Sequence, residues 1–133
     1  MFGSKNKAQN LKLEQLLHQM GSKLPETNWI LLLDKKGRTK AAFSDFIDDV
    51  DRAVAMSAAV HSLGIRITKE LKGGELQYAF FKGTMNDHLI VPLGTKYAIA
   101  FGLGSGISID DYLQSMKTSI APLLQELNVD LGL

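Results

Sequence analysis

The chain has 133 residues, enough for one domain with a hydrophobic core and too few for two of ordinary size. Apolar residues make up 45% of the chain and charged residues 22%, which excludes a disordered protein. Fifteen Lys and Arg face fourteen Asp and Glu. This near balance argues against a nucleic-acid-binding protein, whose affinity comes largely from neutralising phosphates.

The absence of cysteine and the short apolar runs indicate in which cellular compartment the protein is expected. The sequence contains no cysteine, which excludes disulfide and thiol chemistry and fits a reducing environment. Its longest apolar run, Trp29–Leu33, has five residues, whereas crossing a bilayer takes about 20. The first residues lack the apolar segment of a secretory signal, and Phe2 stands where a myristoylation signal needs glycine. We therefore expect a cytoplasmic protein without membrane insertion.

The N-terminal part of the chain predicts a tail and then a helix. Residues 1–7 are small and polar, and we expect them to be flexible. A helix should begin at Ala8 and end before Pro25, which cannot continue it. Its apolar positions recur at the helical period and are Leu13, Leu16, Leu17, Met20 and Leu24.

A strand hairpin is predicted next. The strand Trp29–Leu33 is apolar at every position, so we expect it to be covered on both faces by helices. The turn Asp34–Gly37 can use Gly37 for a positive φ. Arg38–Phe43 is shorter and more polar, which indicates a strand nearer the edge of the sheet.

A long helix is predicted from the acidic segment Ser44–Asp51 to about Leu71. Negative charge at a helix start is favourable by about 0.3–1 kcal/mol per well-placed group. The opening aspartates are Asp45, Asp48, Asp49 and Asp51. One broad apolar stripe contains Val50, Val54, Val60, Leu63 and Ile67. A strip of small residues, which lets another backbone approach closely, contains Ala53, Ala55, Ser57, Ala58, Ala59 and Ser62.

The second half of the chain predicts three strands and a helix. After Gly73-Gly74, the strands Leu76–Phe81, Met85–Pro92 and Tyr97–Phe101 form an antiparallel meander, because short turns join them. The glycine-rich segment 102–106 is expected to be a flexible loop. The last helix should begin at Ser108, where Asp111 gives a capping-box-like start. Pro122 should kink or shorten it.

These elements predict one α/β domain of the α+β kind. Their order is α-β-β-α-β-β-β-α, with a central five-stranded, mostly antiparallel sheet sandwiched by helices. We place the domain at residues 8–128, between the tail 1–7 and a C-terminal tail 129–133.

Several short segments occur in an order typical of one known family. They are Trp29–Leu33 followed by Asp34-x-x-Gly37, the strand end Ala41-Ala42-Phe43, the Ala-rich segment 53–60, Thr68–Leu71 running into Gly74, and Ile90-Val91-Pro92-Leu93-Gly94. Over Leu11–Leu127 the chain therefore resembles the roadblock/dynein light-chain family, whose fold is roadblock/profilin-like. Lys36 and the Asp-rich helix opening depart from the family pattern, on surfaces that could alter the choice of partner.

The resemblance implies a homodimer, or a heterodimer with a paralogous roadblock protein, that acts as a scaffold and binds a Ras-like small GTPase. In the family, protomers join through the long second helix and the strand after it. The residues so implied at the dimer interface are Ala55, Ala58, Ala59, Ser62, Leu76, Tyr78 and Phe80. The strip of small residues on the long helix supports dimerisation independently of the resemblance, although the same residues could pack on their own sheet.

No motif in the sequence predicts catalysis, a metal or a cofactor. The segment Gly102–Gly106 lacks both the dinucleotide fingerprint and the lysine of a phosphate-binding loop. The acidic segment does not match a calcium loop, and His18, His61 and His88 have no zinc spacing. Ser105 is not in a nucleophile elbow. We therefore expect a non-enzymatic protein without cofactors. The alternative is a small-molecule sensor of profilin- or PAS-like architecture, which would need a cavity with convergent polar groups.

Overall fold

The computed structural model describes residues 2–44 and 49–133, with side chains from Ala8 onward. These described residues form four helices and five strands. They are α1 (Phe2–Lys23), β1 (Thr27–Asp34), β2 (Thr39–Ser44), α2 (Val50–Glu70), β3 (Ala79–Lys82), β4 (Asn86–Leu93), β5 (Tyr97–Gly104), α3 (Ile109–Ser119) and α4 (Ala121–Leu127).

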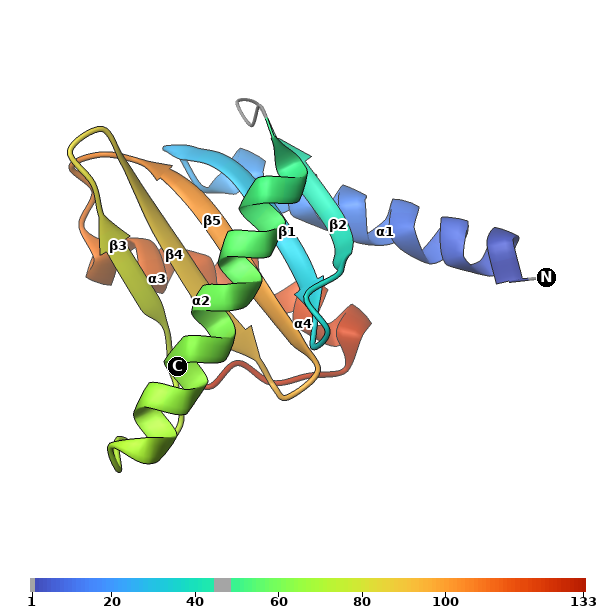
Figure 1. Cartoon of the computed structure of the whole chain (residues 1–133). Helices are drawn as coiled ribbons and strands as arrows, with labels where there is room; N and C mark the ends of the chain where they lie inside the picture. The colour runs from blue at the N-terminus through green and yellow to red at the C-terminus, as the bar shows by residue number, and fades with distance from the viewer. Residues whose placement is uncertain (1, 45–48) are drawn as a thin grey trace.

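The strands form one sheet in the order β2-β1-β5-β4-β3, and each neighbouring pair is antiparallel. Helix α2 crosses one face of this sheet diagonally, and α1, α3 and α4 cover the other (Figure 1). The predicted three-layer α+β architecture is confirmed, as are the edge position of β2 and the meander β3-β4-β5. None of the described helices is long and apolar enough to cross a membrane.

Strand β1 contributes buried side chains to both faces of the sheet, as its uninterrupted apolar sequence predicted. Ile30 and Leu32 belong to the core under α1, α3 and α4. Leu31 and Leu33 belong to the core under α2. All four are essentially inaccessible to solvent, and each such burial stabilises the fold by about 1.5–3 kcal/mol.

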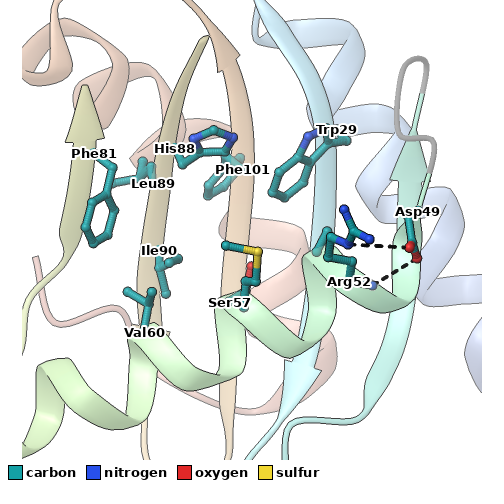
Figure 2. A pocket seen from close by; sticks show the side chains of 12 residues that line it. Trp29, Asp49, Arg52, Ser57, Val60, Phe81, His88, Leu89, Ile90 and Phe101 are labelled. Atoms are coloured by element: carbon teal, nitrogen blue, oxygen red, sulfur yellow. Dashed lines mark hydrogen bonds and ion pairs between the residues drawn. The ribbon is translucent and has the colours of Figure 1, made fainter. Parts of the chain in front are cut away.

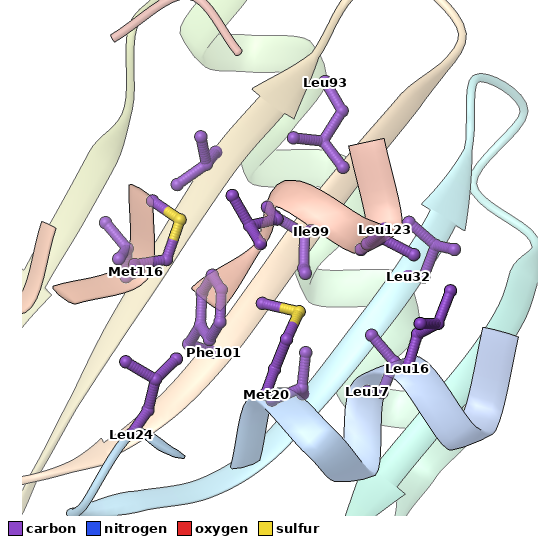
Figure 3. Close-up of a cluster of buried hydrophobic side chains, with 14 of the residues drawn as sticks. Leu16, Leu17, Met20, Leu24, Leu32, Leu93, Ile99, Phe101, Met116 and Leu123 are labelled. Atoms are coloured by element: carbon purple, nitrogen blue, oxygen red, sulfur yellow. The ribbon is translucent and has the colours of Figure 1, made fainter. Parts of the chain in front are cut away.

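The larger core lies under α1, α3 and α4 and holds the fold together (Figure 3). Leu17 and Met20 of α1 pack there beside Phe101 of β5, and Met116 of α3 and Leu123 of α4 complete it. The predicted apolar period of the first helix is confirmed, since all five of its marked positions are buried.

The core under α2 is much smaller. Its buried members are Leu31, Leu33, Val54, Ile90 and Ala100. Among the described helices, α2 alone covers this face of the sheet (Figure 1), and Phe81 of β3 stays 50% exposed.

The helix ends follow local capping chemistry. Asp111 donates its backbone N–H to the Ser108 side chain at 3.3 Å, so Ser108 is the predicted N-cap of α3. Pro122 lies in the first turn of α4, and the expected single final helix is divided at Ile120. Helix α1 begins at Phe2, earlier than the predicted start at Ala8.

Two further predicted boundaries are wrong. The segment Gly102–Gly106 is not wholly a loop, because β5 continues through Gly104. The strand predicted at Leu76–Phe81 is limited to β3, Ala79–Lys82.

The end of the chain returns to the sheet. Leu131 forms an isolated bridge with Leu93 at the end of β4. The side-chain amide of Gln77 donates to the carbonyl oxygen of Gly132 at 3.4 Å. The division into a domain at 8–128 and two tails stays a prediction.

Candidate functional site

Helix α2 starts at a well-formed cap beside the open part of the sheet. Asp49 is the N-cap, and its Oδ1 accepts a hydrogen bond from the backbone N–H of Arg52 at 3.0 Å. The Arg52 Nε lies 3.7 Å from Asp49 Oδ2. Asp51 lies in the first turn, so the predicted role of acidic residues at this helix start holds for Asp49 and Asp51. Asp45 and Asp48 lie outside the described residues.

The small residues of α2 do not share one environment. Ser57 is buried, and Ala53 and Ala58 are half-buried against the core under the helix. Ala58 also packs beside the β1–β2 turn, because a Cβ added at Gly37 would lie 2.9 Å from the Ala58 Cβ. Ala58, placed at a dimer interface by the sequence interpretation, therefore packs within its own protomer.

One exposed side of α2, which borders the sheet at Met56, is apolar. Met56 is 63% exposed, Leu63 56% and Leu71, the C-cap, 76%. With Ala59 and the exposed Ile67 they recur at the helical spacing, so they form one stripe along the helix. We call Met56, Ala59, Leu63, Ile67 and Leu71 the outer stripe. The predicted interface residues Ala55, Ala59 and Ser62 are exposed as well, Ala59 within the outer stripe and the other two on the helix surface beside it.

A groove lies between the N-terminal half of α2 and the sheet (Figure 2). Its volume is about 450 Å³. Its lining residues come from α2, its N-cap and four strands: Trp29, Asp49, Arg52, Ala53, Met56, Ser57, Val60, Phe81, His88, Leu89, Ile90 and Phe101. The lining is mainly apolar. Apart from the N-cap Asp49, its polar side chains are those of Arg52, Ser57 and His88.

The floor of the groove is a row of residues that crosses four strands. Trp29 of β1 is opposite Gly102 of β5, Gly102 is opposite His88 of β4, and His88 is opposite Phe81 of β3. Because Gly102 has no side chain, the Trp29 indole fills its place and approaches the His88 ring, with centroids 5.9 Å apart. We call Trp29, Gly102, His88 and Phe81 the aromatic row.

Strand β3 is the outer strand on this side of the sheet. Phe81 points toward the α2 side and is 50% exposed. Tyr78 and Phe80 pack instead against the core under α1 and α3. The sequence interpretation named Tyr78 and Phe80, which lie toward the face opposite to Phe81. Their place at an interface stays a prediction. The alternation of side chains along a strand shows that Phe80 and Phe81 face opposite ways, and only pairing with β4 shows which is outward.

Leu76 lies before β3 and contacts α2. A Cβ added at Gly64 would lie 2.9 Å from Leu76 Cδ2, so the glycine makes room for this side chain. Leu76 is therefore half-buried against its own helix. The role of the seven predicted residues at an interface stays a prediction, with Ala55, Ala59 and Ser62 placed most favourably for it.

The turn between β3 and β4 is held by a buried carboxylate that the sequence analysis did not single out. Asp87 Oδ1 accepts a hydrogen bond from the backbone N–H of Gly83 at 2.9 Å. The Lys82 Nζ lies 3.8 Å from Oδ2, an ion-pair distance too long for a hydrogen bond. Asp87 thus fixes the hairpin that carries Phe81.

The histidines lie apart, in α1, α2 and β4. His61 is half-buried, with its Nε2 buried and without a hydrogen-bond partner among the described residues. Burial lowers the pKa of the His61 side chain. His61 is therefore a partly buried residue of α2 and not an ordinary surface histidine. Within residues 2–44 and 49–133, no group of three or more His, Asp or Glu side chains is arranged to hold a metal ion.

Comparison with known proteins relates this architecture to solved structures. No protein-family model and no curated protein match the sequence. MglB of Myxococcus xanthus superposes with a TM-score of 0.79 at 12% identity, over 90% of each chain. The gliding protein MglB of Thermus thermophilus gives 0.76 at 14% identity, over 91% of this chain and 92% of that one.

A third solved structure carries the name of the fold. The Roadblock/LC7 domain from Streptomyces avermitilis gives a TM-score of 0.72 at 18% identity, over 84% of this chain and 97% of that one. The three structures match this chain over most of its length. At such low sequence identity, the match shows a shared fold. The chain therefore folds as a roadblock-type domain.

Proposed function

We propose that the protein is a dimeric, non-enzymatic scaffold that binds a Ras-like small GTPase and adjusts its nucleotide cycle. The observation that carries the proposal is the outer stripe of α2, which lies next to an outer strand of the sheet. Contiguous exposed apolar surface of this kind is typical of protein–protein interfaces. The resemblance to the roadblock family suggests the class of partner.

A second copy of the chain suits this surface. Burying a Leu or Met side chain is favourable by about 1.5–3 kcal/mol, so covering the outer stripe supplies a driving force. The outer strand β3 can pair with another strand, which satisfies its free backbone groups.

The charges of α2 favour an antiparallel pairing of two copies. Asp49 and Asp51 lie at its start, whereas Lys69 and Lys72 lie at or just after its end. Two antiparallel α2 helices would bring the acidic start of one copy near the basic end of the other. Such surface pairs contribute little energy, but they select orientation.

The GTPase part of the proposal rests on the resemblance in the sequence and on the fold. Two of the similar structures are MglB proteins, one of them described as a gliding protein. A scaffold needs no catalytic group of its own, because it can act by reshaping the GTPase.

The oligomeric state is the first test. Light scattering at micromolar concentration should give about twice the chain mass of 14.6 kDa. A strict monomer would contradict the dimer. A pull-down against Ras-like GTPases of the same organism, each loaded with GDP or with a GTP analogue, tests the partner. Retention of none of them in either state would leave the GTPase role without support.

The groove favours a second candidate, a small-molecule sensor. Its volume of about 450 Å³ is in the range of ligand pockets, and His88 and Arg52 could orient a polar group. Trp29 is the only tryptophan of the chain and lines the groove, so its fluorescence reports occupancy. A metabolite that quenches this fluorescence saturably in wild type, but not in Val60→Phe, would favour the sensor.

A further inference from the structure

A second hollow lies at the end of the sheet formed by the β1–β2 turn and the β4–β5 turn. Its volume is about 280 Å³, and it is lined by Asp34, Lys35, Lys36, Arg38, Lys40, Lys96 and Tyr97. Five cations and one carboxylate give this group a formal charge of +4. The whole chain carries +1, so the remaining residues together carry −3. Positive charge is therefore concentrated at this end of the sheet.

The single carboxylate, that of Asp34, stabilises the β1–β2 turn through hydrogen bonds. Asp34 Oδ1 accepts hydrogen bonds from the backbone N–H groups of Lys36 and Arg38, each at 2.9 Å. Its Oδ2 accepts from the Arg38 Nε at 2.9 Å. Burial acts to raise the pKa of Asp34, but the hydrogen bonds from Arg38 and Lys36 outweigh it and hold the pKa below its usual value. Asp34 thus fixes the turn and does not neutralise the lysines.

A bulge in β2 adds Lys40 to the group. Leu32 pairs with Ala41 and Leu33 with Thr39, so Lys40 is the extra residue between them. A β-bulge changes the direction of the side chain at the irregular position, and bulges are frequent next to functional sites. Here the re-aimed side chain lines the same hollow as Lys35 and Lys36.

The four lysines of the hollow are left unpaired among the described residues. Lys35, Lys36, Lys40 and Lys96 form no ion pair with any residue in the described parts of the chain. Tyr97, opposite Asp34 in the sheet, adds a hydroxyl group that can donate a hydrogen bond. Like charges held together on a rigid turn repel one another, and a bound anion would relieve this repulsion.

We propose that this hollow, the basic hollow, binds a small anion that carries more than one phosphate group. Lysine ammonium groups are compact donors for phosphate oxygens, and several of them match a multiply charged ligand. Nucleic acid fits less well, because the hollow offers one aromatic side chain for stacking and the whole chain carries a formal charge of only +1. The site is formed by the β1–β2 turn, the β4–β5 turn and the adjoining ends of β1, β2 and β5, so it does not depend on the surface proposed for dimerisation.

The direct test uses inorganic tripolyphosphate as the probe. Amide chemical shifts of the full chain, recorded during titration at low salt, should change saturably around residues 34–40 and 95–97. Affinity should fall as salt rises, because ions screen such contacts. The double variant Lys36→Glu/Lys96→Glu should bind at least about tenfold more weakly. The control Lys12→Glu/Lys69→Glu has the same net charge and alters exposed lysines of α1 and α2, so it should bind like wild type.

Binding measurements with further ligands identify the source of the phosphate groups. Vesicles with a bisphosphorylated inositol lipid, compared with the soluble inositol trisphosphate, separate a lipid headgroup from a free anion. Either source supports the proposal if the hollow variant loses binding and the control variant keeps it. Equal affinity of both variants, or no saturable response to tripolyphosphate, overturns it. Tighter binding of duplex DNA than of tripolyphosphate at equal salt also overturns it, in favour of nucleic acid. The spectra of the variants show that they are folded.

Discussion

The indole of Trp29 occupies the place that a side chain at residue 102 would fill. The two residues are 73 positions apart in the sequence and directly opposite each other on β1 and β5. Gly102 therefore stands in the interior of a strand, where glycine is normally unfavourable, because the neighbouring strand needs the space. This contact lets Trp29 reach His88 and creates the floor of the groove.

Replacing Gly102 by alanine should destabilise the fold. The new Cβ collides with the indole, and overpacking of this kind costs about 1–3 kcal/mol. The emission of the single tryptophan should shift as its ring is displaced. Chemical denaturation followed by fluorescence measures both effects.

Gly104→Ala is the matched control in the same strand. A Cβ there has its nearest neighbours at 3.8 Å, which is an ordinary contact. Its stability and emission should stay close to wild type. If both variants lose the same free energy of unfolding, the loss comes from replacing a glycine in the backbone and not from the collision with the Trp29 indole.

Much of the fold could be predicted from the sequence because its signals are local. The apolar run of β1, the Ser108 cap and the break at Pro122 depend on neighbouring residues only. The end of β5 could not be predicted in this way. Glycines after Phe101 normally indicate a loop, and the reason that Gly102 belongs to a strand lies on β1.

The candidate site was harder to predict than the fold. Helix α2 has apolar residues on two sides, and hydrophobicity alone would bury Leu63 and expose Ser57. The structure does the opposite, because Ser57 faces the sheet and Leu63, six residues later, lies on a different side of the helix. Likewise, the sequence could not decide between Phe80 and Phe81, since one step in register exchanges their faces.

Leu63→Glu should convert a dimer into a monomer. The substitution puts a charge in the middle of the outer stripe, where a covered carboxylate would be unpaired. At a fixed micromolar concentration, light scattering should report a fall from about twice the chain mass to the chain mass. Thermal stability of the isolated protomer should hardly change, because the side chain is already exposed.

Leu11→Glu is the control for this prediction. Leu11 is an exposed leucine of α1, on the opposite side of the sheet, with an exposure of 60% against 56% for Leu63. It should leave the mass unchanged. Loss of the dimer in both variants would show that any added charge suffices, and loss in neither would exclude the outer stripe.

Asp87→Ala should loosen the β3–β4 hairpin. The change removes the acceptor for the Gly83 N–H, and leaving a half-buried donor unsatisfied costs about 1–3 kcal/mol. Hydrogen exchange at the amide of Gly83 should accelerate. Lys82→Ala should have a much smaller effect on stability, because the Lys82 ammonium is exposed and its 3.8 Å ion pair is screened by water. A larger effect of the lysine variant would contradict this account.

His61 should make stability depend on pH below neutrality. Burial holds the pKa of His61 below the value of 6.5 that the unfolded chain has, so the unfolded state takes up a proton first. Its contribution to stability is complete above about pH 6.5 and is lost as the pH falls from there to the folded pKa. In His61→Leu this slope between pH 7 and pH 5 should be reduced, as measured by denaturant unfolding at each pH. His88→Gln, on an exposed position of β4, keeps His61 and should retain the slope. An unchanged slope in His61→Leu would place the titrating group elsewhere.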